Sequence, residues 1–168
     1  MNILLIRHGQ AVDDAPGLDD GGRWLTAKGR KITRKVARWL AKSDKRRPTV
    51  IWSSPLVRSV QTAEIIAAGV DYRGEVRAIP ELSPGRDPGD LMRRFASEPV
   101  LGVLAVVGHE PSLSLIAGAL LGDVGLTGFR KSGVLGLVWE AGEGTPRFLL
   151  DPLEMKAKRR FGPPPAEA

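Results

Sequence analysis

The sequence predicts an α/β fold, a three-layer α/β/α sandwich around a mostly parallel central sheet. Short apolar runs alternate with segments of helical periodicity, which is typical of βαβ units. The 168 residues suffice for one domain with its own core, and neither an internal repeat nor a linker divides them. We therefore expect one domain over residues 1–155, followed by a flexible, basic, proline-rich C-terminal tail over residues 156–168.

The first part of the chain predicts a strand, a loop and a helix. The apolar run at residues 3–6 predicts a buried strand, and a polar loop over residues 11–24 follows it. Thr26 is the expected N-cap of a helix over residues 27–42. The apolar residues that share one face of this helix are Ile32, Val36, Trp39 and Leu40.

The middle of the chain predicts two further strands with a helix between them. A strand at residues 49–52 leads into Ser54 and Pro55, which predict the N-cap and first turn of a helix over residues 55–68. A short strand at residues 76–79 then follows. This order continues the βαβ pattern.

The last part predicts two helices, a strand and a hairpin. Asp87 repeats the cap-plus-proline signal before a helix that ends near residue 96, and a strand covers residues 103–107. The next helix, opened by Glu110-Pro111 and ending near residue 121, turns four apolar residues inward: Leu113, Ile116, Ala117 and Leu120. A closing hairpin at the sheet edge is expected from the strands 134–139 and 147–150 and the glycine-rich turn 141–145.

Composition and charge exclude several classes of protein. The absence of cysteine excludes disulfides, thiolate metal sites and cysteine-nucleophile phosphatases, and it favours the cytoplasm. We expect neither a signal peptide nor a membrane partner, because no apolar stretch approaches the roughly 18 residues of a span. The net charge of +6 lies largely at residues 42–47 and 156–160. Such clusters either steer anionic partners or form a solvated helix end and tail. Without interleaved aromatic residues, we expect no nucleic-acid partner.

The two histidines of the chain both follow apolar strands. His8 stands between Arg7 and Gly9 after the first strand, and His109 follows the strand at residues 103–107. Open α/β sheets bind ligands beyond the carboxyl ends of their strands, so we expect both histidines in one site. Imidazole can attack phosphorus, and guanidinium binds phosphoryl oxygens bidentately. The pattern therefore predicts a phosphoryl-transfer enzyme with a histidine nucleophile.

Each candidate residue has a chemical role. Arg58 lies in the first turn of a predicted helix, where backbone N–H groups also attract anions. Gly9 permits a sharp turn and a close backbone approach. We expect Arg7, Gly9, Arg58 and His109 to bind the phosphoryl group, with His109 donating to the transition state. Positive neighbours favour the neutral imidazole of His8 that attack requires.

Four motifs in order give the chain a specific resemblance to the histidine phosphatase superfamily, which includes the phosphoglycerate mutases. The resemblance covers about residues 2–150. The motifs are Arg7-His8-Gly9, residues 25–29 (LTAKG), residues 53–63 (SSPLVRSVQTA) and residues 106–111 (VVGHEP). The short length and the lack of a large insertion are most similar to the SixA-type phosphohistidine phosphatase subgroup.

The resemblance implies a phosphoglycerate mutase-like fold without a large insertion, with residues 1–155 as the histidine phosphatase domain. It implies that His8 becomes phosphorylated while Arg7, Arg58 and His109 hold the phosphoryl group. It also implies no metal or other cofactor. This agrees with the acidic loop, whose Asp13, Asp14, Asp19 and Asp20 lack the spacing of a calcium loop. The implied partner is a signalling protein that carries phosphohistidine.

The proton donor is where the sequence departs from the pattern of the superfamily. Many members of the superfamily carry a glutamate in the segment after the third strand, but here Glu81 precedes Leu82, whereas the usual acid follows the leucine. Glu81 is a candidate acid or a solvated loop carboxylate, and Asp87 is a weaker candidate. Imidazole is a far better leaving group than an alkoxide, so phosphohistidine needs an acid less than an alkyl phosphate does.

Other functions stay open at this point. A small-molecule phosphomonoesterase is the enzymatic alternative, and a mutase is less favoured because the acid and the insertion are missing. A phosphate-binding regulatory module without turnover is an alternative of a different class.

Overall fold

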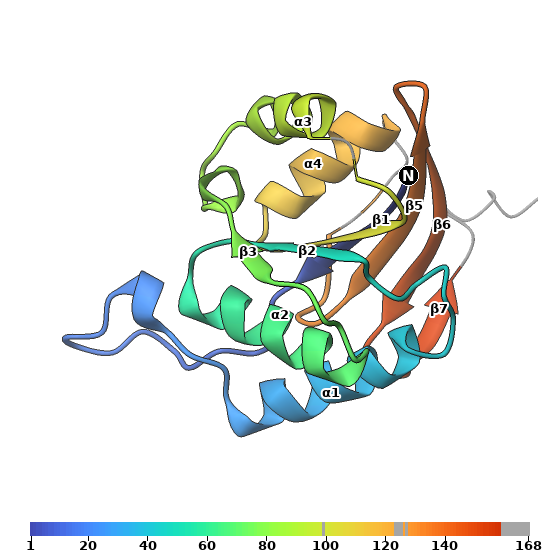
Figure 1. Cartoon of the computed structure of the whole chain (residues 1–168). Coiled ribbons are helices and arrows are strands. Elements are labelled where there is room, and N and C mark those ends of the chain that lie inside the picture. Colours follow the sequence, from blue (N-terminus) through green and yellow to red (C-terminus); the bar gives the residue numbers. More distant parts are fainter. Residues whose placement is uncertain (99, 123–125, 127, 159–168) are drawn as a thin grey trace, which may run out of the picture.

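The computed structural model of the chain describes residues 1–98, 100–122, 126 and 128–158. Within these residues seven strands form one sheet, in the order β3-β2-β4-β1-β5-β6-β7 (Figure 1). The strands are β1 (Asn2–Arg7), β2 (Val50–Ser53), β3 (Val76–Ala78), β4 (Val103–Gly108), β5 (Val134–Glu140), β6 (Glu143–Asp151) and β7 (Lys156–Lys158). The helices are α1 (Ala27–Leu40), α2 (Val57–Gly69), α3 (Pro88–Ser97) and α4 (Ser112–Leu121), with short 3₁₀ turns at Asp20–Gly22 and Pro80–Leu82.

The β3-β2-β4-β1 part of the sheet is parallel, as the sequence predicts. Strands β1 to β4 pair in parallel, β5 runs antiparallel to β1, and the β5-β6-β7 end of the sheet alternates in direction. The first strand reads as a continuous apolar run because helices cover both faces of a parallel sheet. Its residues Ile3, Leu4, Leu5 and Ile6 are at most 1% exposed.

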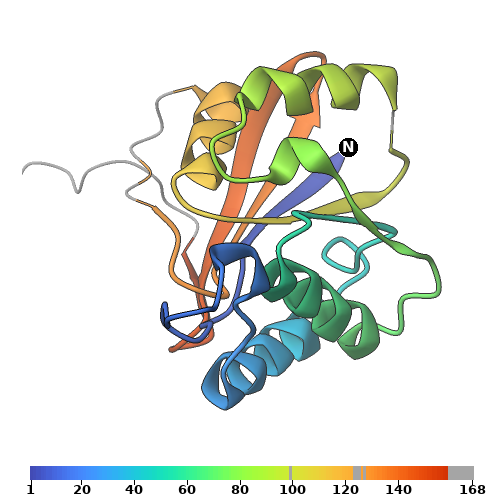
Figure 2. The ribbon, with the colours of Figure 1, turned by 90° about the vertical axis from the view of Figure 1, so that its left-hand side faces the viewer.

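Two helices cover each face of the sheet, which completes the expected three-layer sandwich. Figures 1 and 2 show α1 and α2 on one face and α3 and α4 on the other. The core under α1 and α2 contains Leu4, Ile6 and Val36. The core under α3 and α4 contains Leu5 and Trp52. Alternate residues of β1 therefore serve opposite cores, as the period of a strand dictates.

Two of the predicted helix caps are confirmed. The Thr26 side chain accepts a hydrogen bond from the N–H of Gly29, and the Asp87 side chain accepts one from Gly89. In α4 the four residues expected to face inward are all buried. The buried face of α1 differs from the prediction, because Thr33 and Ala37 occupy its centre. Of the predicted face, Val36 and Leu40 are fully buried, whereas Ile32 and Trp39 are half-buried.

The predicted cap of α2 is wrong. The helix begins at Val57 after Leu56, which makes no side-chain capping bond. The Ser54 hydroxyl instead lies 2.7 Å from the Nε2 atom of His109. The local pattern assigned the Ser54 hydroxyl to the start of the helix, but it contacts His109, 55 residues away.

The closing hairpin forms, but it is not the sheet edge. Strand β5 lies between β1 and β6, and β7 adds a further strand outside β6. The turn is also tighter than expected, because β5 ends at Glu140 and β6 begins at Glu143. Strand β7 uses residues 156–158 of the segment predicted as tail, so that part of the segment belongs to the sheet. The rest of the predicted tail, residues 159–168, lies outside the described residues.

None of the helices in the described part of the chain is both long and apolar enough to cross a membrane.

Two helical glycines give opposite expectations for substitution by alanine. A Cβ at Gly29 would lie 2.2 Å from the carbonyl oxygen of Gln10, whereas a Cβ at Gly118 meets nothing within 4 Å. We expect Gly118→Ala to stabilise the protein by about 0.5–1 kcal/mol through helix propensity. We expect Gly29→Ala to destabilise it by about 1–3 kcal/mol because the helix must move away from the loop. Urea unfolding of both variants checks the pair, and equal effects of the two substitutions would contradict this packing.

Candidate active site

The two histidines lie side by side because their strands are neighbours. Strand β1 pairs in parallel with β4, and Arg7 is in register with Gly108. The backbone N–H of His8 donates to the carbonyl of Gly108 at 3.0 Å, which continues the pairing by one residue. The imidazole rings of His8 and His109 have centroids 5.0 Å apart. Both side chains are buried, with His8 8% and His109 3% exposed.

The surroundings of His8 define its protonation state. Nδ1 lies 2.7 Å from the carbonyl oxygen of Gly9, and because a carbonyl can only accept, Nδ1 carries the proton. Burial above all, and then the positive charges of Arg58 and Arg7, lower the pKa of His8 to about 4. At neutral pH the ring is therefore uncharged, and its Nε2 atom carries the free lone pair that a nucleophile needs.

His109 is held by hydroxyl groups. Its Nε2 atom lies 2.7 Å from Oγ of Ser54 and 3.3 Å from Oγ of Ser59. Burial, and then the like charges of His8 and Arg58, lower the pKa of His109 to about 3. Its Nδ1 atom is buried and has no hydrogen-bond partner among the described residues. This nitrogen therefore has unused hydrogen-bonding capacity.

Arg58 is the buried cation of the site. It is the second residue of α2 and is 6% exposed, so its guanidinium lies near the positive end of that helix. Both of its terminal nitrogens donate to Asp20, one to the backbone carbonyl and one to the carboxylate at 2.9 Å. The hydrogen bond from Arg58 lowers the pKa of Asp20. Local sequence does not reveal this orienting role of Asp20, because the contact joins residues 38 positions apart.

Gly9 connects the site to two helices. Its N–H donates to Oγ1 of Thr62 in α2 at 3.0 Å. A Cβ at this position would lie 2.8 Å from Oγ1 of Thr33 in α1, so the close approach of these elements requires glycine. The turn after β1 is thereby fixed between the two helices, and with it the position of the His8 ring.

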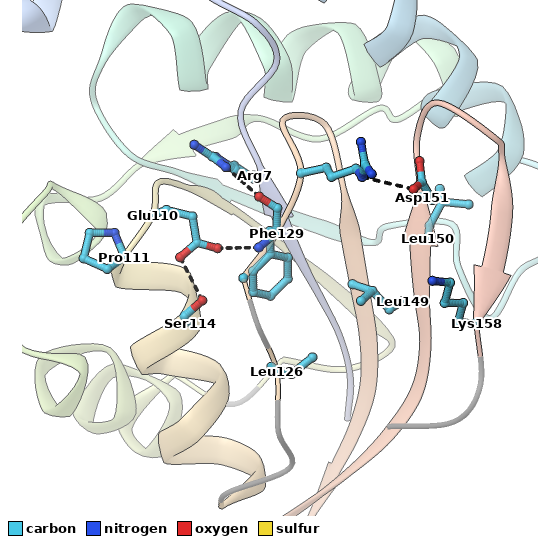
Figure 3. Close-up of a pocket in the computed structure, with 12 residues that line it drawn as sticks. Arg7, Glu110, Pro111, Ser114, Leu126, Phe129, Leu149, Leu150, Asp151 and Lys158 are labelled. Atoms are coloured by element: carbon cyan, nitrogen blue, oxygen red, sulfur yellow. Dashed lines mark hydrogen bonds and ion pairs between the residues drawn. The ribbon is translucent and has the colours of Figure 1, made fainter. Parts of the chain in front are cut away.

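Arg7 points to the other side of the sheet from His8. It lines a cavity of about 760 Å³ between the start of α4 and the ends of β6 and β7 (Figure 3). Its Nη1 atom donates to the carbonyl of Phe129 at 2.6 Å, and the carboxylate of Glu110 accepts from the N–H of Phe129. The Nε atom of Arg7 is buried and unpartnered among the described residues. Neither histidine lines this cavity, which adjoins the histidine pair through Arg7.

Glu81 does not join this group. Its carboxylate forms an ion pair with Arg94 at 2.7 Å and lines a separate pocket with residues of α3. Although its burial acts in the opposite direction, hydrogen bonds from its own backbone and from Arg94 lower the pKa of Glu81. A carboxylate held in its ionised form is a poor proton donor. The weaker candidate, Asp87, caps α3.

The described residues around the two histidines have a chemistry that suits an anion. They contain no group of three or more histidine, aspartate or glutamate side chains that could hold a metal. The positive charges of Arg58 and Arg7 act on the ring of His8 instead, and the hydroxyls of Ser54 and Ser59 contact the ring of His109. Such a set can bind a tetrahedral oxyanion and supply a nitrogen nucleophile.

Comparison with known protein families agrees with this chemistry. A sequence profile described as the histidine phosphatase superfamily (branch 1) matches residues 3–86. An uncharacterized protein of Picosynechococcus sp. is 35% identical over 148 residues, which cover 82% of this chain and 84% of that protein. The phosphohistidine phosphatase SixA of Escherichia coli K12 is 29% identical over 160 residues, which cover 93% of this chain and 97% of that protein.

A solved structure has the same fold. It is the protein histidine phosphatase SixA complexed with tungstate, which superposes with a TM-score of 0.79 at 28% identity. The match covers 93% of this chain and 100% of the other. Together with the sequence matches, it confirms the resemblance that the four motifs predict.

The depressed histidine pKa values predict how stability depends on pH. In the folded protein His8 and His109 take up protons only near pH 4 and pH 3. In the unfolded chain they do so at about pH 6.5, so the unfolded state binds more protons as the pH falls below that value. When the pH falls from 7 to 5, we expect the free energy of unfolding to decrease in the wild type by about 2–4 kcal/mol more than in the double variant His8→Gln/His109→Gln. Urea unfolding at both pH values measures this difference, and parallel losses would contradict buried, neutral histidines.

Proposed function

We propose that this chain, which belongs to the histidine phosphatase superfamily and is a phosphatase, removes phosphate from phosphohistidine in a signalling protein. The observation that carries the proposal is the neutral His8, whose tautomer is set by the Gly9 carbonyl and whose pKa is lowered by burial and by Arg58 and Arg7, while Glu81 is held in an ion pair with Arg94. The name of the Escherichia coli relative supports the substrate class. The tungstate in the related solved structure supports a site for a tetrahedral oxyanion. The cysteine-free composition suits the cytoplasm.

The reaction would proceed in two displacements. First, the Nε2 atom of His8 attacks phosphorus, the bond from phosphorus to the substrate's imidazole nitrogen breaks, and that nitrogen keeps the electron pair and takes a proton from solvent. Water then attacks the phosphoryl group on His8, loses a proton to solvent, and the new phosphorus–nitrogen bond breaks. The products are orthophosphate and the neutral His8 with which the cycle began.

The other site residues would stabilise the charge of the transferring group. Arg58 and Arg7 supply two fixed positive charges next to His8, which is why both lower its pKa. The unpartnered Nε of Arg7 and Nδ1 of His109 are buried nitrogens with free hydrogen-bonding capacity. In the tautomer protonated at Nδ1, His109 would donate to a phosphoryl oxygen. Asp20 would orient Arg58 through its two contacts.

The ion pair of Glu81 supports phosphohistidine over an alkyl phosphate. An alkoxide leaves slowly unless an acid protonates it, whereas imidazole leaves readily. Because Arg94 holds Glu81 as a carboxylate away from the histidines, the site is suited to the easier leaving group. We therefore propose that Glu81 has a structural role.

A small phosphate ester is the second candidate substrate, and one observation favours it. The cavity of about 760 Å³ beside Arg7 has room for the rest of a small molecule whose phosphate lies at the histidines. Arg130 and Asp151 line it and pair with each other at 3.1 Å, so it presents both charges to a ligand. Turnover of aryl or sugar phosphates faster than that of phosphohistidine would favour this candidate.

The mechanism predicts a phosphoenzyme that depends on His8. We expect His8→Ala to lower kcat/KM for a histidine-phosphorylated protein domain by at least about 10³-fold. Arg58→Ala should cost about 3 kcal/mol of transition-state stabilisation, or roughly 10²-fold. Arg73→Ala, an exposed arginine outside the site, is the control and should have no effect. Rapid quenching with labelled substrate should trap an acid-labile phosphoenzyme in the wild type, whereas phosphate binding without one would indicate the silent regulatory module.

A separate variant tests the role of Glu81. Glu81→Gln removes the carboxylate but keeps its size, so we expect kcat/KM for phosphohistidine to stay within about 3-fold of the wild type. The melting temperature should fall slightly, because the variant breaks an ion pair that is only partly buried. A loss of about 10²-fold or more in kcat would instead identify Glu81 as a general acid.

A further inference from the structure

A stripe of basic side chains runs along the outer face of α1. Lys28, Lys31, Lys35 and Arg38 follow one another at intervals of three and four residues, which places them on one line of the helix. All four are exposed. We call this set the α1 stripe. Exposed Arg34 lies beside it, and the line spans about 15 Å at the rise of an α-helix.

The α1 stripe is not accounted for by the stability of the helix. None of its members forms an ion pair within the described part of the chain. Like charges three and four residues apart destabilise a helix by about 0.2–0.5 kcal/mol per pair. The first turn of α1 contains no acidic residue, and Lys28 there opposes the helix dipole. Arg38 in the last turn suits the helix dipole, but the three lysines are unfavourable for the isolated helix.

The stripe begins at the rim of the active site. The N–H of Thr26 donates to the carbonyl of Gln10 at 2.9 Å, and Gly29 approaches the same backbone closely. Gln10 is only two residues after His8. Figure 2 shows the start of α1 next to the loop of residues 11–24 that leads into it. A protein held over the histidines would thus lie within reach of the near end of the stripe.

We propose that the α1 stripe is the docking surface for an acidic face of the phosphoprotein substrate. This inference rests on the proposed function, since it names how the partner of the same site is held. Carboxylates of the partner would pair with the four cations and relieve their mutual repulsion. Attraction over such a surface raises the rate of encounter and fixes the orientation in which the phosphohistidine enters the site.

The structure favours a protein over a membrane or a nucleic acid. The apolar residues Val36, Ala37 and Leu40 of α1 are fully buried against the sheet, so the helix has no apolar face to insert into a bilayer. The exposed face carries no aromatic residue for base stacking, and Trp39 packs against Phe148 and Arg46 instead. A phosphoprotein substrate, by contrast, must contact the surface around the catalytic site.

The test uses charge reversal at the near end of the stripe. The variant Lys28→Glu/Lys31→Glu changes two exposed residues that make no contact with the histidines or arginines of the site. The control variant, Arg73→Glu/Arg147→Glu, makes the same change of net charge at exposed positions on the α2–β3 connection and on β6. The substrates are a histidine-phosphorylated domain with an acidic surface, the same domain with those carboxylates changed to amides, and free phosphohistidine.

We expect the stripe variant to lower kcat/KM for the acidic domain by about 10-fold or more, mainly through KM, at low ionic strength. With the amide domain and with free phosphohistidine, kcat/KM of the stripe variant should stay within about 2-fold of the wild type. The control variant should stay within about 2-fold of the wild type with all three substrates. Added salt should reduce the difference. Equal losses on all three substrates would mean that the variant damages catalysis, and no loss on the acidic domain would overturn the docking surface.

Binding of the unphosphorylated acidic domain separates the docking surface from the chemistry. If the wild type hydrolyses no phosphohistidine but binds this domain more tightly than the stripe variant does, the proposed function fails and the docking surface stands. Equal binding by wild type and stripe variant overturns the docking surface whatever the activity. A DNA duplex is titrated in parallel, and a stripe-dependent affinity for the duplex but not for the domain would also overturn it.

Discussion

The parallel pairing of β1 with β4 is the constraint on which the rest of the site depends. Both strands are central and fully covered, so the register of Arg7 with Gly108 cannot slip without moving apolar residues to the wrong core. That register alone brings His8 and His109, 101 residues apart in sequence, to a ring separation of 5.0 Å. Because side chains alternate along a strand, Arg7 and His8 point to opposite faces of the sheet. Arg7 therefore approaches the site from a different side than Arg58 does.

Burial of this pair has an energetic cost that its hydrogen bonds partly offset. A histidine next to two arginines and out of water can remain only if it is neutral, and a neutral ring needs a partner for its one N–H. The carbonyl of Gly9 meets that need for His8. In His109 the hydroxyls of Ser54 and Ser59 contact Nε2, so in the tautomer protonated at Nδ1 they donate to that nitrogen and the N–H is left for a ligand. The same contacts that make burial tolerable thus also select the tautomer in which Nε2 of His8 is free.

The sequence predicted what local patterns control and missed what distant contacts control. The apolar runs, the caps at Thr26 and Asp87 and the order of elements follow from short-range physics, and the structure confirms them. Ser54 was misassigned because its hydroxyl serves a ring 55 residues away rather than the next helix. Asp20 was missed for the same reason, since nothing near it in sequence shows that it meets Arg58. Strand β7 is too short and too basic to show the alternation by which strands are recognised.

Selectivity in such a site must come from outside the pocket. The phosphoryl group and the leaving imidazole are common to all phosphohistidines, so the buried residues that would contact them cannot distinguish one phosphoprotein from another. The ion pair that holds Glu81 on Arg94 disfavours poor leaving groups, but it does not distinguish one phosphohistidine from another. Differences in affinity between partners can then arise only on surfaces that reach beyond the phosphate. The α1 stripe, whose cations have no ion pair among the described residues, starts beside the turn after His8 and is such a surface. A partner of opposite charge would relieve its repulsion.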